Sequence, residues 1–157
     1  MKNTQETPTH IDLSGPRGFN FLTGTWLVHH TVKRPTGDWW EFEGTSVNRS
    51  LMDGSANVED NTFYKPTGIT HGVALRAYDA KTDQWAIWWL DSRDPLARHD
   101  PPQVGKFEGG IGLFYSDFVE NGNPMRLRFL WSEITPRRDA LPKRRQNAPG
   151  MGSVWPM

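Results

Sequence analysis

Several titratable side chains lie inside runs of alternating apolar residues, where they could do acid–base or ion-pairing chemistry. They are His30, Glu59, Arg76, Asp91 and Arg128. A neutral imidazole can act as a general base or as a metal ligand. An arginine can hold an anionic group, but burying it costs several kcal/mol unless it is paired. We therefore expect any inward-facing arginine to meet one of three acids, Glu41, Glu59 or Asp91.

The histidines do not form a metal site by their spacing. His30 has no second histidine on its own strand face, because His29 points to the opposite side. His10, His71 and His99 are scattered, and the chain has no cysteine. Metal sites need three or four ligands. We therefore expect neither a metal nor another cofactor.

Asp91 and Arg93 end the run Trp-Trp-Leu-Asp-Ser-Arg, which allows two interpretations. Asp91 could be an acid or base with Arg93 as an anion clamp, or the two could form an ion pair where a strand ends. We favour the second interpretation. Ser92 lies in no G-x-S-x-G elbow. The glycine run 109–112 lacks the Lys-Ser/Thr of a phosphate loop and indicates a hairpin turn.

Composition argues against nucleic acid as a partner. The chain has eight Trp residues, which could stack on bases, and equal numbers of basic and acidic residues. Residues 1–134 hold 13 basic and 17 acidic residues, so their net charge is −4. Phosphates would be repelled by this charge. No apolar run approaches the length of a membrane span, so no membrane partner is expected either.

The elements that carry these residues are predicted to be strands. Turn signals such as Pro-Thr-Gly-Asp and Asn-Gly recur about every ten residues, and no helical apolar stripe of adequate length is present. This spacing is typical of an all-β barrel or sandwich. The predicted strands are 21–34, 39–52, 56–64, 70–79, 84–92, 104–108, 112–119 and 125–133.

The chain divides into three predicted segments. Residues 1–18 are polar and predict a flexible arm. Residues 19–134 form a single β-barrel domain. Residues 135–157 carry five basic residues, one acid and four prolines, which predict a poorly ordered tail without regular elements. Without cysteines or an evident signal segment, a cytoplasmic location is expected.

A series of short motifs resembles a bacterial lipocalin-like family of unknown function. The resemblance covers about residues 19–134 and implies an antiparallel barrel of the calycin type, akin to the nitrobindin-like group, with no activity to carry over. In nitrobindin-like barrels a late histidine holds haem, and here no histidine follows His99. The motifs are F-L-T-G-T-W (21–26), F-E-G-T (42–45), H-G-V-A-L-R (71–76), W-W-L-D-S-R (88–93), D-P-P-Q-V-G-K-F (100–107) and R-L-R-F-L-W (126–131).

The resemblance stops after Ile134. Family members usually continue with two further strands, whereas Arg137 to Val154 lacks their alternation. We hypothesise a slip of the reading frame near Thr135. The barrel would then be incomplete at its C-terminal end, and the first and eighth strands would expose unpaired edges. Such edges could pair with a second copy or with another strand.

Alternation along the strands predicts an interior that mixes aromatic rings with a few charges. A small barrel filled only by side chains should be almost wholly apolar inside. We therefore predict a non-enzymatic protein that binds a small, partly apolar molecule in the barrel, with Arg76 or Arg128 pairing with an anionic group of that molecule. The alternatives are a small enzyme using His30, Glu59 or Asp91, and an interaction subunit pairing through an open edge. The predicted lining is Trp26, His30, Glu59, Arg76, Trp89, Asp91 and Arg128.

Overall fold

The computed structural model describes residues 11–96, 101–135, 143–146 and 153–156; for the last two ranges it describes the backbone alone. Short 3-10 helices are η1 (Gly15–Arg17), η2 (Asn20–Leu22) and η3 (Met52–Gly54). The long strands are β1 (Gly24–Lys33), β2 (Trp39–Leu51), β3 (Ala56–Lys65), β4 (Gly68–Asp79), β5 (Gln84–Asp91), β6 (Gln103–Glu108), β7 (Ile111–Glu120) and β8 (Asn123–Trp131). Two short strands follow, β9 (Lys143–Gln146) and β10 (Ser153–Pro156).

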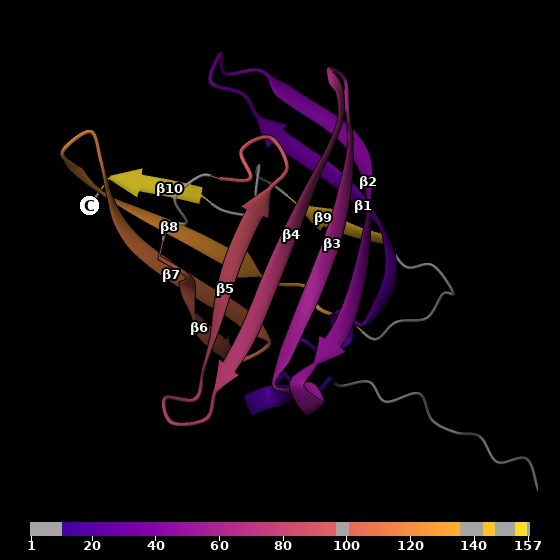
Figure 1. The fold of residues 1–157 in the computed structure, drawn as a ribbon, viewed down its shortest axis with the longest axis vertical. Helices are drawn as coiled ribbons and strands as arrows, with labels where there is room; N and C mark the ends of the chain where they lie inside the picture. Colours follow the sequence, from indigo (N-terminus) through magenta and orange to yellow (C-terminus); the bar gives the residue numbers. More distant parts are fainter. Residues whose placement is uncertain (1–10, 97–100, 136–142, 147–152, 157) are drawn as a thin grey trace, which may run out of the picture.

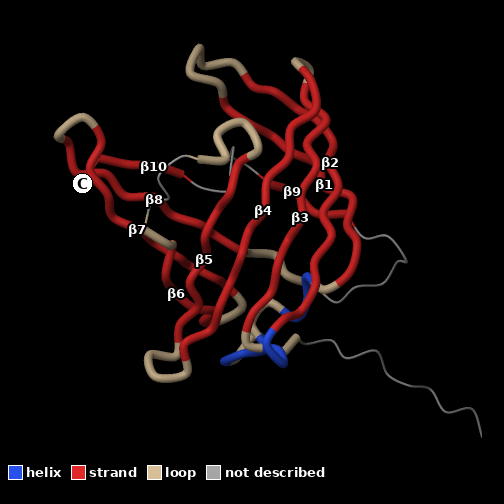
Figure 2. Tube along the Cα trace, in the orientation of Figure 1, coloured by secondary structure: helices blue, strands red, loops and turns tan. Residues whose placement is uncertain are grey.

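Strands β1 to β8 form an antiparallel meander in which each strand pairs with the next along the chain. The sheet curls into a half-barrel, as Figures 1 and 2 show. The all-β, incomplete-barrel prediction is confirmed. The antiparallel half-barrel is also compatible with the calycin resemblance.

The hairpin turns lie where the sequence predicts them. Gly109 and Gly110 between β6 and β7 both have positive φ (59° and 79°), as do Asn121 and Gly122 between β7 and β8 (50° and 80°). Two successive positive φ values give the twist that a two-residue hairpin needs. One strand start is corrected: Phe21 belongs to η2, so β1 begins at Gly24 rather than at residue 21.

Register decides which side chains share the inner face. Across β4, β5 and β6, Arg76 lies opposite Ile87, and Ile87 lies opposite Gln103. Residues that are directly opposite share one face of a sheet. Polar residues are buried on this face alongside the apolar ones, as the alternation predicted. The buried polar set is His30, Ser46, Asn48, Asn57, Glu59, Asn61, Arg76, Gln103 and Ser116.

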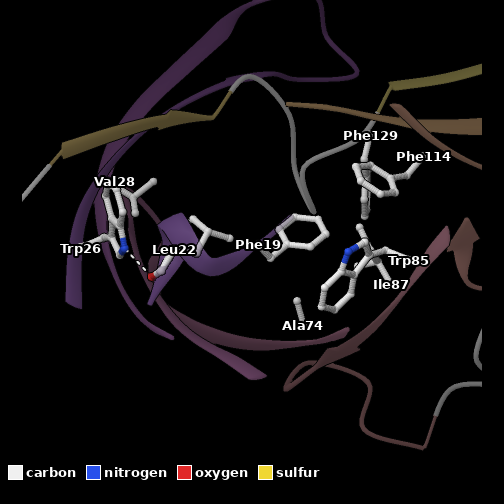
Figure 3. Close-up of a cluster of buried hydrophobic side chains, with 9 residues drawn as sticks. All are labelled: Phe19, Leu22, Trp26, Val28, Ala74, Trp85, Ile87, Phe114 and Phe129. Carbon is white, nitrogen blue, oxygen red and sulfur yellow. Dashed lines mark hydrogen bonds between the residues drawn. The ribbon is translucent and has the colours of Figure 1, made fainter. Parts of the chain in front are cut away.

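An aromatic plug packs around Phe19 at the end of the half-barrel where the helical turns lie, the lower end of the ribbon in Figure 1. Phe19, at the start of η2, lies 5.1 Å from the Trp85 ring, 4.9 Å from Phe107 and 5.4 Å from Phe114, measured between centroids. Figure 3 shows the rings of Phe19, Trp85 and Phe114 together with Trp26 and its neighbours. The η1 segment is tied down as well, because the Trp85 indole donates to the Gly15 carbonyl at 3.1 Å.

The last two strands lie at the two edges of the meander. Strand β9 pairs in parallel with residues 27–30 of β1, and β10 pairs antiparallel with residues 125–128 of β8. The prolines therefore do not exclude short strands after residue 135, and the expectation that both edges are unpaired is wrong over these stretches. The division into arm, domain and tail stays a prediction. Residues 1–10, 97–100, 136–142, 147–152 and 157 lie outside the described part of the chain.

Candidate functional site

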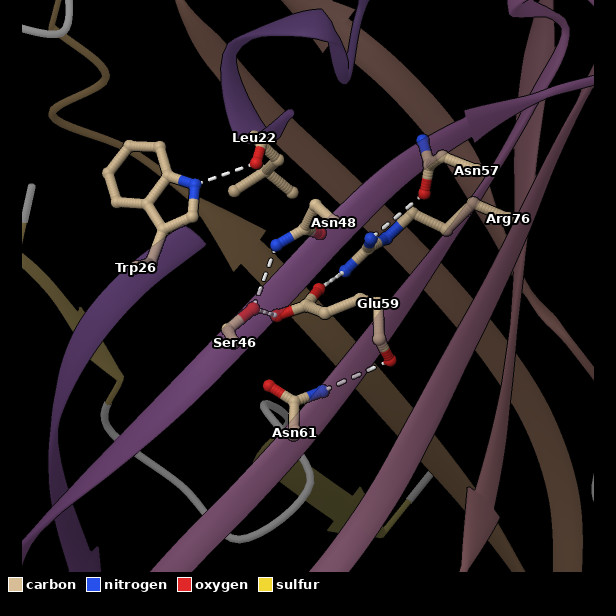
Figure 4. A network of polar contacts seen from close by, with 8 residues as sticks. All are labelled: Leu22, Trp26, Ser46, Asn48, Asn57, Glu59, Asn61 and Arg76. Atoms are coloured by element: carbon tan, nitrogen blue, oxygen red, sulfur yellow. Dashed lines mark hydrogen bonds and ion pairs between the residues drawn. The ribbon is translucent and has the colours of Figure 1, made fainter. Parts of the chain in front are cut away.

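A polar network crosses the middle of the inner face (Figure 4). The guanidinium of Arg76 on β4 pairs with the carboxylate of Glu59 on β3, and both side chains are fully buried. Arg76 Nη1 also donates to Asn57 Oδ1 at 3.0 Å. The hydroxyl of Ser46 donates to the other oxygen of Glu59 at 2.8 Å. This network supplies the partner that an inward arginine requires, and Glu59 is one of the three acids that the sequence offered.

Two aromatic rings make cation–π contacts with the Arg76 guanidinium. Its central carbon lies 4.8 Å from the centroid of Phe19 and 5.6 Å from that of Trp131. A planar cation over a ring face is a favourable contact, more so where water is excluded. The positive charge of Arg76 is therefore already matched inside the protein.

Two amide side chains leave buried oxygen acceptors without a hydrogen-bond partner in the described part of the chain. Asn48 donates to Ser46 Oγ at 2.8 Å, and Gln103 donates to Ser116 Oγ at 3.2 Å and to the Pro101 carbonyl at 3.5 Å. The remaining oxygens, Asn48 Oδ1 and Gln103 Oε1, have no partner there. Each residue is only 5% exposed.

The orientation of both amides follows from their neighbours. The only hydrogen of the Ser46 hydroxyl goes to Glu59, so Asn48 must turn its NH₂ group toward Ser46. The Pro101 carbonyl can only accept, so Gln103 must turn its NH₂ group toward it. The two unpartnered atoms are therefore acceptors, and they suit a group that donates hydrogen bonds.

Four rings form what we call the aromatic platform, between the polar network and the open end of the half-barrel: His30, Phe42, Phe63 and Trp89. His30 stacks on Phe42 at 4.9 Å and meets Phe63 edge-on at 5.0 Å, and Phe63 lies 6.1 Å from Trp89. His30 and Phe42 are buried, whereas Phe63 and Trp89 are half-buried. Because Phe63 and Trp89 share the inner face, their accessible surface turns toward the concave side of the sheet.

Glycines let two of these rings lie close to the sheet. A Cβ atom on Gly72 would fall 2.1 Å from the six-membered ring of Trp89. A Cβ atom on Gly44 would fall 2.8 Å from His30 Nε2. Both distances are far below van der Waals contact, so the ring positions depend on glycine at these two residues.

Charged residues mark the open end. Arg93 holds the Asp91 carboxylate through Nε at 2.9 Å, Nη2 at 2.6 Å and its backbone N–H at 2.9 Å. These hydrogen bonds lower the pKa of Asp91 to about 2. The favoured interpretation of the run, an ion pair at a strand end, matches this geometry.

Lys65 at the end of β3 also lies at the open end, on the face of Phe63. Its Nζ lies 5.5 Å from the centroid of the Phe63 ring. Burial lowers the pKa of Lys65, the positive charge of Arg93 lowers it further, and the negative charge of Asp91 opposes both. Lys65 is thus partly withdrawn from water and near a second cation.

The predicted lining residues divide into three groups. Glu59 and Arg76 meet in the polar network, while His30, Trp89 and Asp91 face inward toward the open end. Trp26 faces inward too, but it packs at the closed end and donates to the Leu22 carbonyl at 2.6 Å.

The predicted inward orientation of Arg128 is wrong. Arg128 lies opposite Tyr115, whereas its neighbour Phe129 lies opposite the fully buried Phe114. Phe129 therefore points inward and Arg128 points to the outer face. Leu127, Phe129 and Trp131 form a wholly apolar set on one face of β8, so the alternation of the sequence already favoured the face that the structure turns inward.

Sequence reasoning missed Lys65, Asn48 and Gln103. Lys65 belongs to a turn motif, Lys-Pro-Thr-Gly, and Gln103 to a proline-rich loop, so each resembles a solvated residue. Asn48 gave one usable signal, because it alternates with Gly44 and Ser46 on a predicted strand. Their burial depends on strand pairing, which the sequence does not specify.

Comparison with known proteins gives no identification. No protein-family model matches the chain, and no curated protein is significantly similar to it. Within the described residues, no three His, Asp or Glu side chains are grouped so that they could hold a metal ion. No helix in that part of the chain is long and apolar enough to cross a membrane.

Proposed function

We propose that this protein binds a small, partly apolar molecule on the inner face of its half-barrel, without turning it over. The observation that carries the proposal is the half-exposed surface of Phe63 and Trp89 on the concave side of the sheet. Aromatic surface removed from water by a ligand contributes about 25 cal/mol per Å², and ring stacking adds to this. The aromatic platform thus offers a ligand its apolar contact.

The two unpartnered acceptors indicate which polar group the ligand should carry. Leaving a buried acceptor unsatisfied costs about 1–3 kcal/mol. A ligand that donates a hydrogen bond to Asn48 Oδ1 or Gln103 Oε1 would remove that cost. A molecule with one apolar ring or chain and one hydroxyl or amide donor matches these groups.

Calorimetric titration tests the proposal with a panel of fatty acids, aromatic carboxylates, and aromatic alcohols and amides that carry a hydrogen-bond donor. The expected result is saturable binding by the natural chain, weakened at least about tenfold by Trp89→Leu, since a central tryptophan commonly contributes 2 kcal/mol or more to an interface.

Trp88→Leu is the matched control, because Trp88 lies next to Trp89 but lies opposite Leu75 on the outer face. Binding by this variant should equal that of the natural chain. Absence of saturable binding across the panel, or equal losses in the two variants, would refute the proposed site.

The catalytic alternative has less support from the geometry. Both of its carboxylates, Glu59 and Asp91, are held by arginines, and the pKa of Asp91 is lowered rather than raised toward neutrality. A general acid or base works best with a pKa near the working pH. A search for turnover that is lost in His30→Ala would be the test of this alternative.

A further inference from the structure

Lys65 forms no ion pair with any residue that the structure describes. Its ammonium has no carboxylate oxygen within 4.0 Å among the described residues. The nearby Asp91 is engaged by Arg93 through three hydrogen bonds. Deeper on the inner face, Glu59 and Arg76 balance each other. The nearby charge of Asp91 favours the charged form of Lys65, but Lys65 forms no ion pair among the described residues and can still pair with an anion.

The position of Lys65 relates its charge to the aromatic platform. Lys65 is half-buried and lies on the same face as Phe63, two residues earlier on β3. Its Nζ is 5.5 Å from that ring, and the next ring of the platform, Trp89, is 6.1 Å from Phe63. A ligand covering Phe63 and Trp89 would thus end beside the ammonium. Partial burial strengthens an ion pair relative to one in open water.

We infer that Lys65 binds the carboxylate of an amphipathic anion whose apolar part covers Phe63 and Trp89. This inference rests on the proposed function and names the class of its ligand. It transfers the anion-binding role from the two arginines that the sequence suggested, since Arg76 is neutralised by Glu59 and Arg128 faces outward. A lysine suits this role because its compact charge needs no fixed bidentate geometry.

The test compares two probes that share one ring system and differ in charge, 2-naphthoate and the neutral ketone 2-acetonaphthone. Isothermal titration calorimetry would measure both with the natural chain, Lys65→Met and Lys33→Met. The natural chain should bind the carboxylate about tenfold tighter than the ketone, the difference expected for one charge-assisted hydrogen bond. In Lys65→Met this preference for the carboxylate should vanish.

Lys33→Met is the matched control, since Lys33 is an exposed lysine at the end of β1, opposite in orientation to the buried Val32. It should keep the full preference for 2-naphthoate. Added salt should reduce the ratio of the affinities for 2-naphthoate and 2-acetonaphthone, because ions screen the pair of Lys65 and the carboxylate near the surface.

The outcomes separate the two proposals. Equal binding of both probes by the natural chain would overturn the role of Lys65 and leave the binding function standing. Loss of the carboxylate preference in Lys33→Met as well as in Lys65→Met would overturn it too, since a general surface charge would then be responsible. Failure of the natural chain to bind either probe would overturn the binding function itself. Thermal unfolding followed by circular dichroism would establish that each variant is folded.

Discussion

At the scale of single residues, the interior depends on one buried ion pair. Glu59 and Arg76 are both fully buried, and Ser46, Asn57 and the ring of Phe19 satisfy the remaining sides of the pair. Removing one partner from such a pair leaves an uncompensated charge, whereas removing both can be nearly neutral. The presence of the pair therefore says more about which packing arrangement the interior favours than about the net free energy of unfolding.

Arg76→Met should destabilise the fold by about 3–5 kcal/mol, because Glu59 would remain buried without its cation. The double variant Arg76→Met with Glu59→Gln should regain a large part of this loss. Urea unfolding followed by tryptophan fluorescence measures both free energies of unfolding. Equal losses in the single and double variants would show that the cost comes from packing and not from charge.

Asp91 gives the fold a predicted dependence on acid. Its pKa is lowered from 3.8 to about 2 by the hydrogen bonds from Arg93. A carboxyl whose folded pKa lies below its unfolded value stabilises the fold above the unfolded value. That contribution should be present above pH 4 and lost as the pH falls from about 4 to 2.

Asp91→Asn should lower the free energy of unfolding at pH 6 by about 1 kcal/mol. The loss is smaller than the pKa shift alone implies, because Arg93 is exposed and water screens the ion pair. The same variant should lose less stability than the natural chain between pH 4 and 2. Asp60→Asn, on an exposed outward position of β3, is the control and should follow the natural chain. Urea unfolding at several pH values measures the free energy of unfolding of each variant. If this free energy falls with pH in the same way for Asp91→Asn and the natural chain, Asp91 is not the cause of the acid dependence.

At the scale of elements, close contacts on glycines fix how the strands pack. A Cβ atom on Gly105 of β6 would fall 1.8 Å from the Leu113 carbonyl oxygen on β7, a backbone atom. At Gly72 of β4 the obstacle is the Trp89 side chain, at 2.1 Å. A ring can rotate away, but a paired strand cannot move without breaking its ladder.

Gly105→Ala should therefore destabilise the fold more than Gly72→Ala, by about 3 kcal/mol or more against about 1–2 kcal/mol. Gly72→Ala should also weaken binding at the aromatic platform, because Trp89 must leave its place over the sheet. Chemical denaturation and ligand titration of the two variants check these expectations. A larger loss of stability in Gly72→Ala would contradict this packing argument.

At the scale of the whole molecule, the sheet does not close on itself. The described strands run from β10 beside β8 to β9 beside β1, and β1 does not pair with β8 among them. Open edges attract other strands, and natural proteins cover them. The short strands β9 and β10 cover four residues of each edge. Pairing of two copies through the remaining edges stays a prediction.

Deletion of residues 136–157 should uncover both edges and promote self-association. Sedimentation velocity should then show a larger share of dimers or higher species than the full chain at equal concentration. The expected cause is exposed backbone N–H and C=O groups along β1 and β8. A truncated chain that sediments as the full chain does would show that β9 and β10 do not protect the edges.

The sequence by itself determined the eight long strands, the hairpins and most of the two faces, but not the short strands β9 and β10. These features follow from local causes: a two-residue alternation separates the faces, and Gly or Asn with positive φ sets the turns. Thus Trp26, Val28 and His30 were correctly placed on one inward face of β1. The start of β1 was misjudged because η2 folds under the plug, a contact with strands far along the chain.

Only the tertiary structure decided which residues meet. The pairing of Arg76 with Glu59 rather than Asp91 depends on strand register. The burial of Gln103 and the approach of Phe63 to Trp89 depend on register and on the curl of the sheet. Register and curl arise from the summed packing of side chains from many strands, so a single sequence read strand by strand does not contain them.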